Sequence, residues 1–114
     1  MRKLAKEIKI VSERHAESLQ KGDNISSNKD YEILISLINQ VRKMPDNGEG
    51  IFRELIDIES DAVTLFAATY LLPLDAPFAL RKLEIIAGKK GSVAFDAGIV
   101  IEEWRSGKLK LASI

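Results

Sequence analysis

Apolar residues recur at the spacing of an α-helix along almost the whole chain of 114 residues. Near the start, Leu4, Ile8 and Val11 share one face of a helix, while charged side chains occupy the other faces. Glycines and prolines interrupt the pattern at intervals, where helices are expected to end. The spacing therefore predicts an all-α protein, with helices over about residues 2–20, 28–44, 49–58, 61–72, 76–87 and 92–105.

Polar residues mark where these helices should begin. We expect a loop over residues 23–28 before the second helix, and Pro77 suits the first turn of the fifth helix. Short side chains with an oxygen atom can accept a hydrogen bond from the first free backbone N–H groups of a helix. The expected N-caps are Asn28, Ser60 or Asp61, and Ser92, and Asp75 precedes Pro77 where the fifth helix should start.

The last segment allows two interpretations. Residues 93–101 are rich in branched side chains and could form a buried strand. We favour a helix, because the apolar spacing continues through Glu102 and Glu103 to Trp104 at helical steps. A glycine inside a helix, as Gly98 would be, makes the helix about 1 kcal/mol less stable than alanine does. A close contact between helices would explain a glycine at this position.

A shift of 30 positions aligns the third and fourth predicted helices with the fifth and sixth. Such a repeat of a helical hairpin is typical of stacked, solenoid-like arrays. We therefore predict one domain, residues 1–114, of three stacked hairpins over residues 2–44, 49–72 and 76–105. The identical pairs are Glu54 and Glu84, Ile56 and Ile86, Val63 and Val93, and Ala67 and Ala97; the similar pairs are Leu55 and Ile85, Leu65 and Phe95, Ala68 and Gly98, and Leu71 and Ile101.

The residues needed for catalysis are scarce. The chain has no cysteine and one histidine, which excludes disulfides, thiolate metal sites and histidine-rich metal sites. No phosphate-binding loop, zinc-protease or nucleophile-elbow motif occurs. His15 lies on the apolar stripe of the first helix, and we interpret it as a packed, partly buried residue. We expect no enzyme activity, catalytic residue, metal or cofactor.

Targeting segments are also missing from the sequence. Glu7 and Lys9 interrupt the stretch where a signal peptide needs an apolar core. The longest apolar stretch, residues 62–72, is shorter than the roughly 20 residues that span a bilayer. We therefore expect a cytoplasmic protein without a membrane partner.

Two stretches, AATYLLPLDAPFALRKLEIIA and FDAGIVIEEWRSGKL, resemble a small bacterial family of HEAT-like helical domains catalogued as a domain of unknown function. The resemblance covers roughly residues 28–110 and implies a short right-handed superhelix. It departs from HEAT repeats at Thr64 and Ala94, where arginine is common. Members of the family are often encoded beside bacterial toxins. The resemblance thus implies an immunity protein that binds and neutralises one cognate toxin domain.

The net charge of zero conceals an acidic segment, residues 46–61, with six carboxylates and one arginine. These carboxylates could simply be solvated or could stabilise helix N-termini. They could also form a docking surface that attracts a basic partner, in which case lysine at positions 57, 59 and 61 would abolish binding. Asp96 could alternatively support its helix end, and Trp104 could cap the core. The expected partner-binding residues are Asp57, Glu59, Asp61, Thr64, Asp96, Glu103 and Trp104.

Two other functions remain possible from the sequence. A basic cluster of Arg81, Lys82, Lys89 and Lys90 could bind nucleic acid, although a net charge of zero and the lack of interleaved aromatic residues make this unlikely. Affinity that falls steeply with salt would identify such binding. A regulatory adaptor is the third possibility, and the neighbouring gene would distinguish it from an immunity protein.

Overall fold

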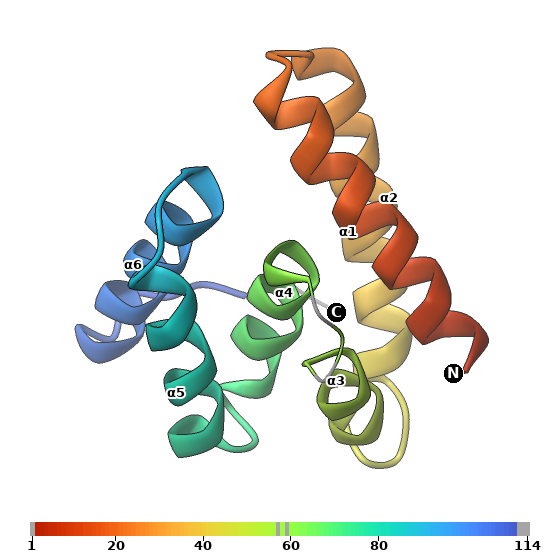
Figure 1. Ribbon diagram of the computed structural model, residues 1–114. Coiled ribbons are helices and arrows are strands. Elements are labelled where there is room, and N and C mark those ends of the chain that lie inside the picture. The colour runs from red at the N-terminus through yellow and green to blue at the C-terminus, as the bar shows by residue number, and fades with distance from the viewer. Residues whose placement is uncertain (1, 57, 59, 112–114) are drawn as a thin grey trace.

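The computed structural model describes residues 2–56, 58 and 60–111, and it confirms the all-α class (Figure 1). Within these residues the chain forms six helices and no strand. The helices are α1 (Lys3–Gln20), α2 (Asn24–Arg42), α3 (Glu49–Ile56), α4 (Asp61–Leu71), α5 (Ala76–Ala87) and α6 (Ser92–Arg105). None of the helices in the described part is long and apolar enough to cross a membrane.

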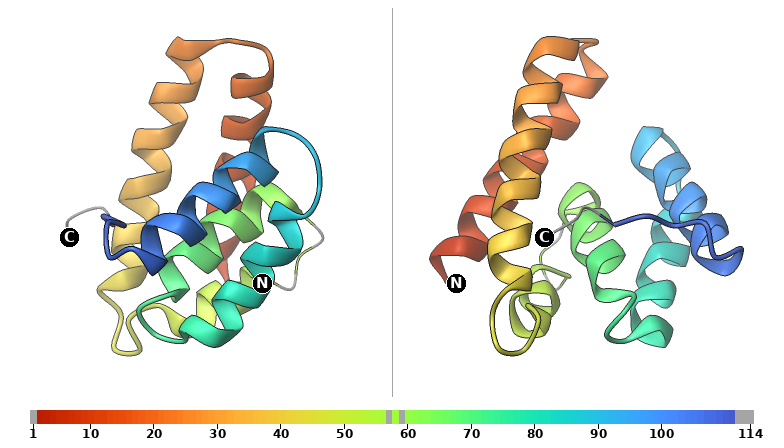
Figure 2. Two further views of the ribbon diagram at one scale, coloured as in Figure 1. Left: turned by 90° about the vertical axis from the view of Figure 1, so that its left-hand side faces the viewer. Right: turned by 180° about the vertical axis from the view of Figure 1, so that it is seen from behind.

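Consecutive helices pack as pairs, α1 with α2, α3 with α4, and α5 with α6 (Figures 1 and 2). Helix α4 lies between the first and last pairs and also contacts α1, α5 and α6. Because it has neighbours on several sides, α4 is apolar around most of its circumference, as expected of a central helix. Its buried residues are Val63, Thr64, Leu65, Ala67, Ala68, Tyr70 and Leu71.

The capping interactions agree with the predicted starts of α4 and α5. The Ser60 hydroxyl accepts a hydrogen bond from the Val63 N–H at 3.4 Å, and the Asp75 carboxylate accepts one from the Phe78 N–H at 3.4 Å. At α6 the residue before the helix is Gly91, and Ser92 is the first helical residue. The predicted Ser92 cap is therefore wrong. Gly91 has φ +106°, which a residue with a side chain rarely adopts.

Helix α2 begins earlier than the sequence pattern predicts. The Asp23 carboxylate accepts a hydrogen bond from the Ser26 N–H at 3.1 Å and is the N-cap. Asn24 to Asn28 are therefore helical, and the predicted loop over residues 23–28 is wrong. The buried Ser27 hydroxyl donates to the carbonyl oxygen of Asn24, so its polar group is satisfied inside the helix. Polar residues that looked like a loop are the first turn of a capped helix.

The segment over residues 93–101 is helical, as the spacing predicts. Ala94, Ala97 and Ile101 are its buried residues, at the steps of three and four that place side chains on one face. The explanation offered for Gly98 is wrong, however. A Cβ atom built on Gly98 meets nothing within 4 Å, so no neighbouring helix requires a glycine there.

Candidate functional site

A groove is lined by residues of α1, α2, α4, α6 and the C-terminal segment. Helix α4 lies between the first and last hairpins (Figure 1). Its main cavity has a volume of about 240 Å³, and a smaller cavity of about 30 Å³ shares four of the same residues. We call this feature the central groove. Its lining includes His15 of α1, Tyr31 of α2, Phe66 of α4, Asp96 of α6, and Leu109 and Leu111 of the C-terminal segment.

His15 is held at the wall of the central groove by both polar and aromatic contacts. Its Nδ1 atom lies 2.9 Å from the carbonyl oxygen of Ser27. Since a carbonyl oxygen only accepts, Nδ1 carries the proton and donates it, which leaves Nε2 as the free ring nitrogen. The ring centroid is 5.7 Å from that of Tyr31 and 5.8 Å from that of Phe66. The prediction of a packed, partly buried histidine is confirmed.

Asp96 brings a carboxylate to the same groove from the opposite wall. It is half-buried and makes no hydrogen bond or ion pair with any residue that the structure describes. Burial raises the pKa of Asp96 above its usual value, while the nearby His15 acts in the opposite direction. A desolvated carboxylate without a direct partner favours a cationic group, and the rings of Tyr31 and Phe66 offer additional attraction for a cation.

The C-terminal segment occupies one end of the central groove. After α6, Gly107 adopts φ +74° and the chain turns back toward α4 and α2 (Figure 2, right). The backbone N–H groups of Lys108 and Leu109 both donate to the carbonyl oxygen of Glu103, at 2.8 and 3.1 Å. Leu109 and Leu111 pack against the core, and Lys110 between them is exposed. The groove thus holds a non-helical segment in which apolar and basic residues alternate.

The predicted partner-binding residues of α4 do not form an open acidic surface. Asp61 is bound by Lys89, whose Nζ lies 3.1 and 2.9 Å from the two carboxylate oxygens. The side chain of Thr64 is only 7% exposed, so a contact through it, as predicted, is not available at the surface. Asp57 and Glu59 lie outside the described residues.

The predicted residues of α6 have separate environments. Asp96 lines the central groove, whereas Glu103 anchors the C-terminal segment through its backbone oxygen. Trp104 is partly buried and packs against the core, in agreement with its interpretation as a core cap. Among the members of the predicted set that the structure describes, only Asp96 lines the groove.

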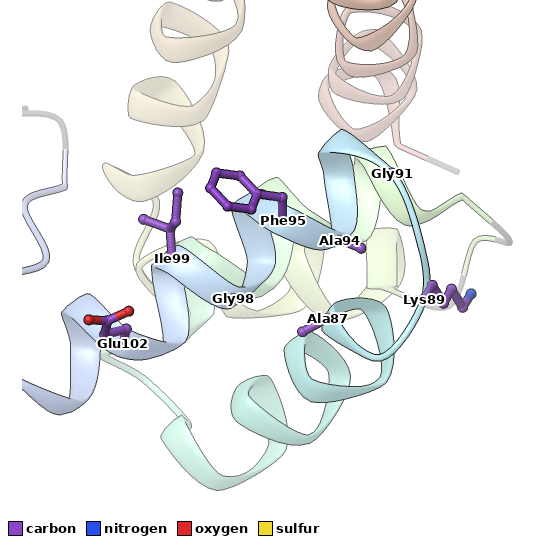
Figure 3. A pocket seen from close by; sticks show the side chains of 8 residues that line it. All are labelled: Ala87, Lys89, Gly91, Ala94, Phe95, Gly98, Ile99 and Glu102. Carbon is purple, nitrogen blue, oxygen red and sulfur yellow. The ribbon is translucent and has the colours of Figure 1, made fainter.

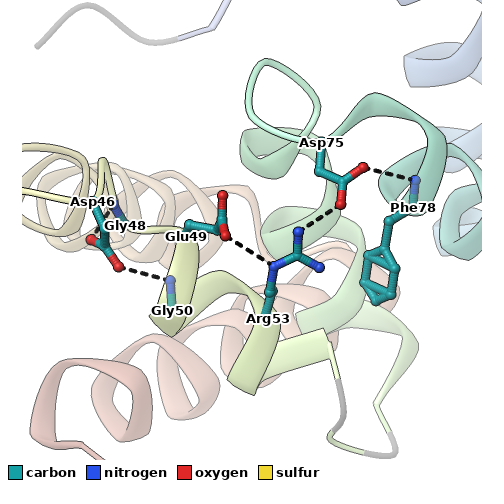
Figure 4. A network of polar contacts seen from close by, with 7 residues as sticks. All are labelled: Asp46, Gly48, Glu49, Gly50, Arg53, Asp75 and Phe78. Atoms are coloured by element: carbon teal, nitrogen blue, oxygen red, sulfur yellow. Dashed lines mark hydrogen bonds and ion pairs between the residues drawn. The ribbon is translucent and has the colours of Figure 1, made fainter.

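The described carboxylates of the acidic segment are all engaged, and the contacts of Asp46, Glu49 and Arg53 near α3 are drawn in Figure 4. Asp46 accepts from the N–H groups of Gly48 and Gly50, each at 2.9 Å, and these bonds lower its pKa. Arg53 contacts Glu49 at 3.4 Å and Asp75 at 2.6 Å. The Arg53 guanidinium, followed by the N–H of Phe78, lowers the pKa of Asp75. These charges are compensated within the chain, as expected if they stabilise helix ends.

The basic cluster also has internal partners. The charged groups of Arg53, Arg81 and Lys82 lie 5.0, 5.8 and 5.4 Å from the ring centre of Phe78, within the range of cation–π interactions. Lys89 binds Asp61. The cluster is thus partly occupied by contacts that stabilise the last two hairpins.

A second hollow, of about 480 Å³, lies between α5 and α6 on the outside of the last hairpin (Figure 3). Phe95 and Ile99 of α6 stand beside it, and Ala87, Ala94 and Gly98 contribute small residues to its lining. We call it the α5–α6 hollow. Phe95 and Ile99 make part of its edge apolar, and both side chains are exposed.

The sequence pattern predicted neither the central groove nor the α5–α6 hollow, and the reason is the same for both. In the sequence, Tyr31 and Phe66 fall on apolar stripes typical of core residues, and their positions beside His15 and Asp96 depend on how three hairpins pack. Phe95 carried a weak signal, because the shift of 30 positions pairs it with Leu65. That pairing did not show that one of the two residues would be exposed.

Comparison with known proteins shows the fold alone. No protein-family model matches the chain, and no curated protein matches it. The crystal structure of the protein RPA1889 from Rhodopseudomonas palustris CGA009 is similar, with a TM-score of 0.86 and 19% sequence identity. The similarity covers 96% of this chain and 91% of that one. The chain therefore shares its arrangement of helices with a solved bacterial protein along nearly its full length.

Proposed function

We propose that this chain is a protein-binding module that receives an extended segment of a partner protein in the central groove. The observation that carries the proposal is the C-terminal segment, which already lies in one end of the groove. Leu109 and Leu111 pack inward while Lys110 faces solvent. The remaining cavity continues along the floor formed by α4 toward Asp96.

The chemistry of the groove selects a segment with apolar and basic side chains. Phe66 and Tyr31 supply apolar and aromatic surface, which rewards burial of a leucine-like side chain. Asp96 supplies a carboxylate without a direct partner, which rewards an ammonium or guanidinium group. A short segment that alternates the two kinds of residue satisfies both requirements. The chain's own C-terminal segment also alternates them, with Leu109 and Leu111 packed against the core and Lys110 exposed.

The expected partner is a domain of a bacterial toxin, and the chain would then act as its immunity protein. This part of the proposal rests on the resemblance to HEAT-like domains encoded beside toxin genes. Binding of a toxin segment in the groove would place the rest of the module over the toxin's surface and block access to it. Asp96 and the groove take the role that the sequence assigned to the acidic segment, because the described carboxylates of that segment have partners within the chain.

A peptide titration tests the groove directly. The probe is a fluorescent peptide of alternating leucine and lysine, and its matched partner has glutamate in place of lysine. We expect the lysine peptide to bind the full chain and the glutamate peptide to bind at least about tenfold more weakly, since a bond to a charged group contributes about 1.5–3 kcal/mol. Substitution Asp96→Asn should remove most of this preference.

The matched control is Glu32→Gln, which neutralises an exposed carboxylate on α2. It changes the net charge of the chain by the same amount as Asp96→Asn and should leave peptide binding unchanged. Equal binding of the two peptides, or equal weakening by the two substitutions, would contradict the proposal. Tight binding of duplex DNA that decays steeply with salt would instead favour a nucleic-acid module.

A further inference from the structure

We propose that the outer face of the last hairpin binds the same face of a second copy of this chain. The face consists of Phe95 and Ile99 on α6 and the α5–α6 hollow beside them. It is separate from the central groove, because Asp96 and Val100 of α6 line the groove while Phe95 and Ile99 line the hollow. The inference therefore stands independently of the proposed function.

The shape of this face suits the close approach of another helix. Phe95 and Ile99 are one helical turn apart and project beside a hollow of about 480 Å³ (Figure 3). The hollow is lined in part by Gly98, around which a Cβ atom would meet nothing within 4 Å. Large apolar side chains thus lie next to an unfilled space on the same surface. A surface that carries both can be complementary to itself across a two-fold axis.

The internal repeat indicates what should cover this face. A shift of 30 positions pairs Leu55 with Ile85 and Leu65 with Phe95. Leu55 and Leu65 are 0% and 8% exposed, whereas Ile85 and Phe95 are 60% and 69% exposed. Equivalent positions of the repeat are thus buried in α3 and α4 and exposed in α5 and α6, so whatever covers the last hairpin must offer apolar contacts of its own.

Charge complementarity selects a second copy as the occupant. Lys89 and Glu102 lie at opposite ends of the α5–α6 hollow (Figure 3). A two-fold axis through the hollow brings Lys89 of each copy toward Glu102 of the other, so opposite charges meet at both ends. Glu102 is exposed and has no ion-pair partner among the described residues. Lys89 already holds Asp61, but the exposed ammonium group has three N–H donors in total.

Sedimentation velocity over a wide concentration range tests the contact. We expect a reversible monomer–dimer equilibrium for the full chain. Phe95→Glu should raise the dimer dissociation constant at least about 30-fold, the effect of losing a central aromatic anchor. The matched control is Ile10→Glu, because Ile10 of α1 is 51% exposed and lies on the first hairpin. Its dimerisation should equal that of the unsubstituted chain.

Two charge reversals test the two-fold symmetry. Lys89→Glu and Glu102→Lys should each weaken the dimer, because each places like charges at both ends of the contact. An equimolar mixture of the two variants should restore dimerisation, since both ends then pair a lysine with a glutamate. Circular dichroism verifies that each variant keeps its helical content. A monomer at every concentration, a dimer indifferent to Phe95→Glu, or a mixture that fails to recover would overturn the proposal.

Discussion

Substitution Gly98→Ala is expected to stabilise the fold, although the residue lies in the middle of α6 among small side chains. The position has helical neighbours on both sides, and a Cβ atom there meets nothing within 4 Å. The new methyl group therefore creates no overlap that would offset its favourable effects.

The magnitude follows from the backbone. A glycine inside a helix costs about 1 kcal/mol relative to alanine, mainly because it loses more conformational freedom on folding. With no steric penalty, the free energy of unfolding should rise by about 1 kcal/mol. For a chain of this length, the corresponding rise in Tm is about 4 °C.

Urea denaturation followed by circular dichroism measures the effect, at a concentration low enough for both proteins to be monomeric. Gly48→Ala is the matched control. Gly48 has φ +87°, and its Cβ would lie 2.5 Å from Cγ1 of Val41 and 2.9 Å from Cε2 of Phe52. This variant should be strongly destabilised. If Gly98→Ala is neutral or destabilising while the helical content is unchanged, the open space around Gly98 has been misjudged and the reasoning fails.

Three other perturbations address buried polar groups and a helix cap. Ser12→Ala should raise the free energy of unfolding by about 1 kcal/mol in urea titrations, since the buried Ser12 hydroxyl has no hydrogen-bond partner among the described residues; a loss of stability would reveal a partner. Ser60→Ala should lower it by about 1 kcal/mol, because the N–H of Val63 loses its cap; Thr69→Ser, outside the caps, provides a comparison. Because burial raises the folded-state pKa of Asp96, its contribution to stability is fully present below the unfolded-state pKa and is lost as the pH rises through the folded-state value. The stability of the unsubstituted chain relative to Asp96→Asn should therefore fall from acid to neutral pH in paired denaturation curves, and a rise would reverse the assigned sign.

The helices and several of their ends could be predicted because their signals are local. Ser60 and Asp75 reach backbone N–H groups only three residues ahead, so the sequence contains the whole interaction. The helical steps from Val93 through Ala97 and Val100 to Trp104 likewise favour a helix over a strand without reference to any other helix. The start of α2 was missed because Asp23 and Asn28 are both acceptable caps, and the burial of Ser27 decides between them.

The candidate site was less predictable, since its residues come from five separate parts of the chain. The acidic segment looked like a docking surface until the structure placed Arg2, Arg53 and Lys89 beside its carboxylates. Asp96 was among the residues selected from the sequence, but the absence of a partner for it in the described residues depends on three-dimensional packing. A carboxylate is compensated only when a cation or a hydrogen-bond donor lies close to it in three dimensions.

The sequence by itself determined an all-α chain and the faces of its helices, because periodicity and capping act within a few residues. Only the tertiary structure decided which of those apolar faces are covered. Leu65 and Phe95 occupy equivalent positions in the 30-residue shift, yet one is buried and the other is exposed. The physical reason is that burial requires neighbours: α4 lies among α1, α3, α5 and α6, whereas α6 makes its main contacts with α5 and α4 among the described helices.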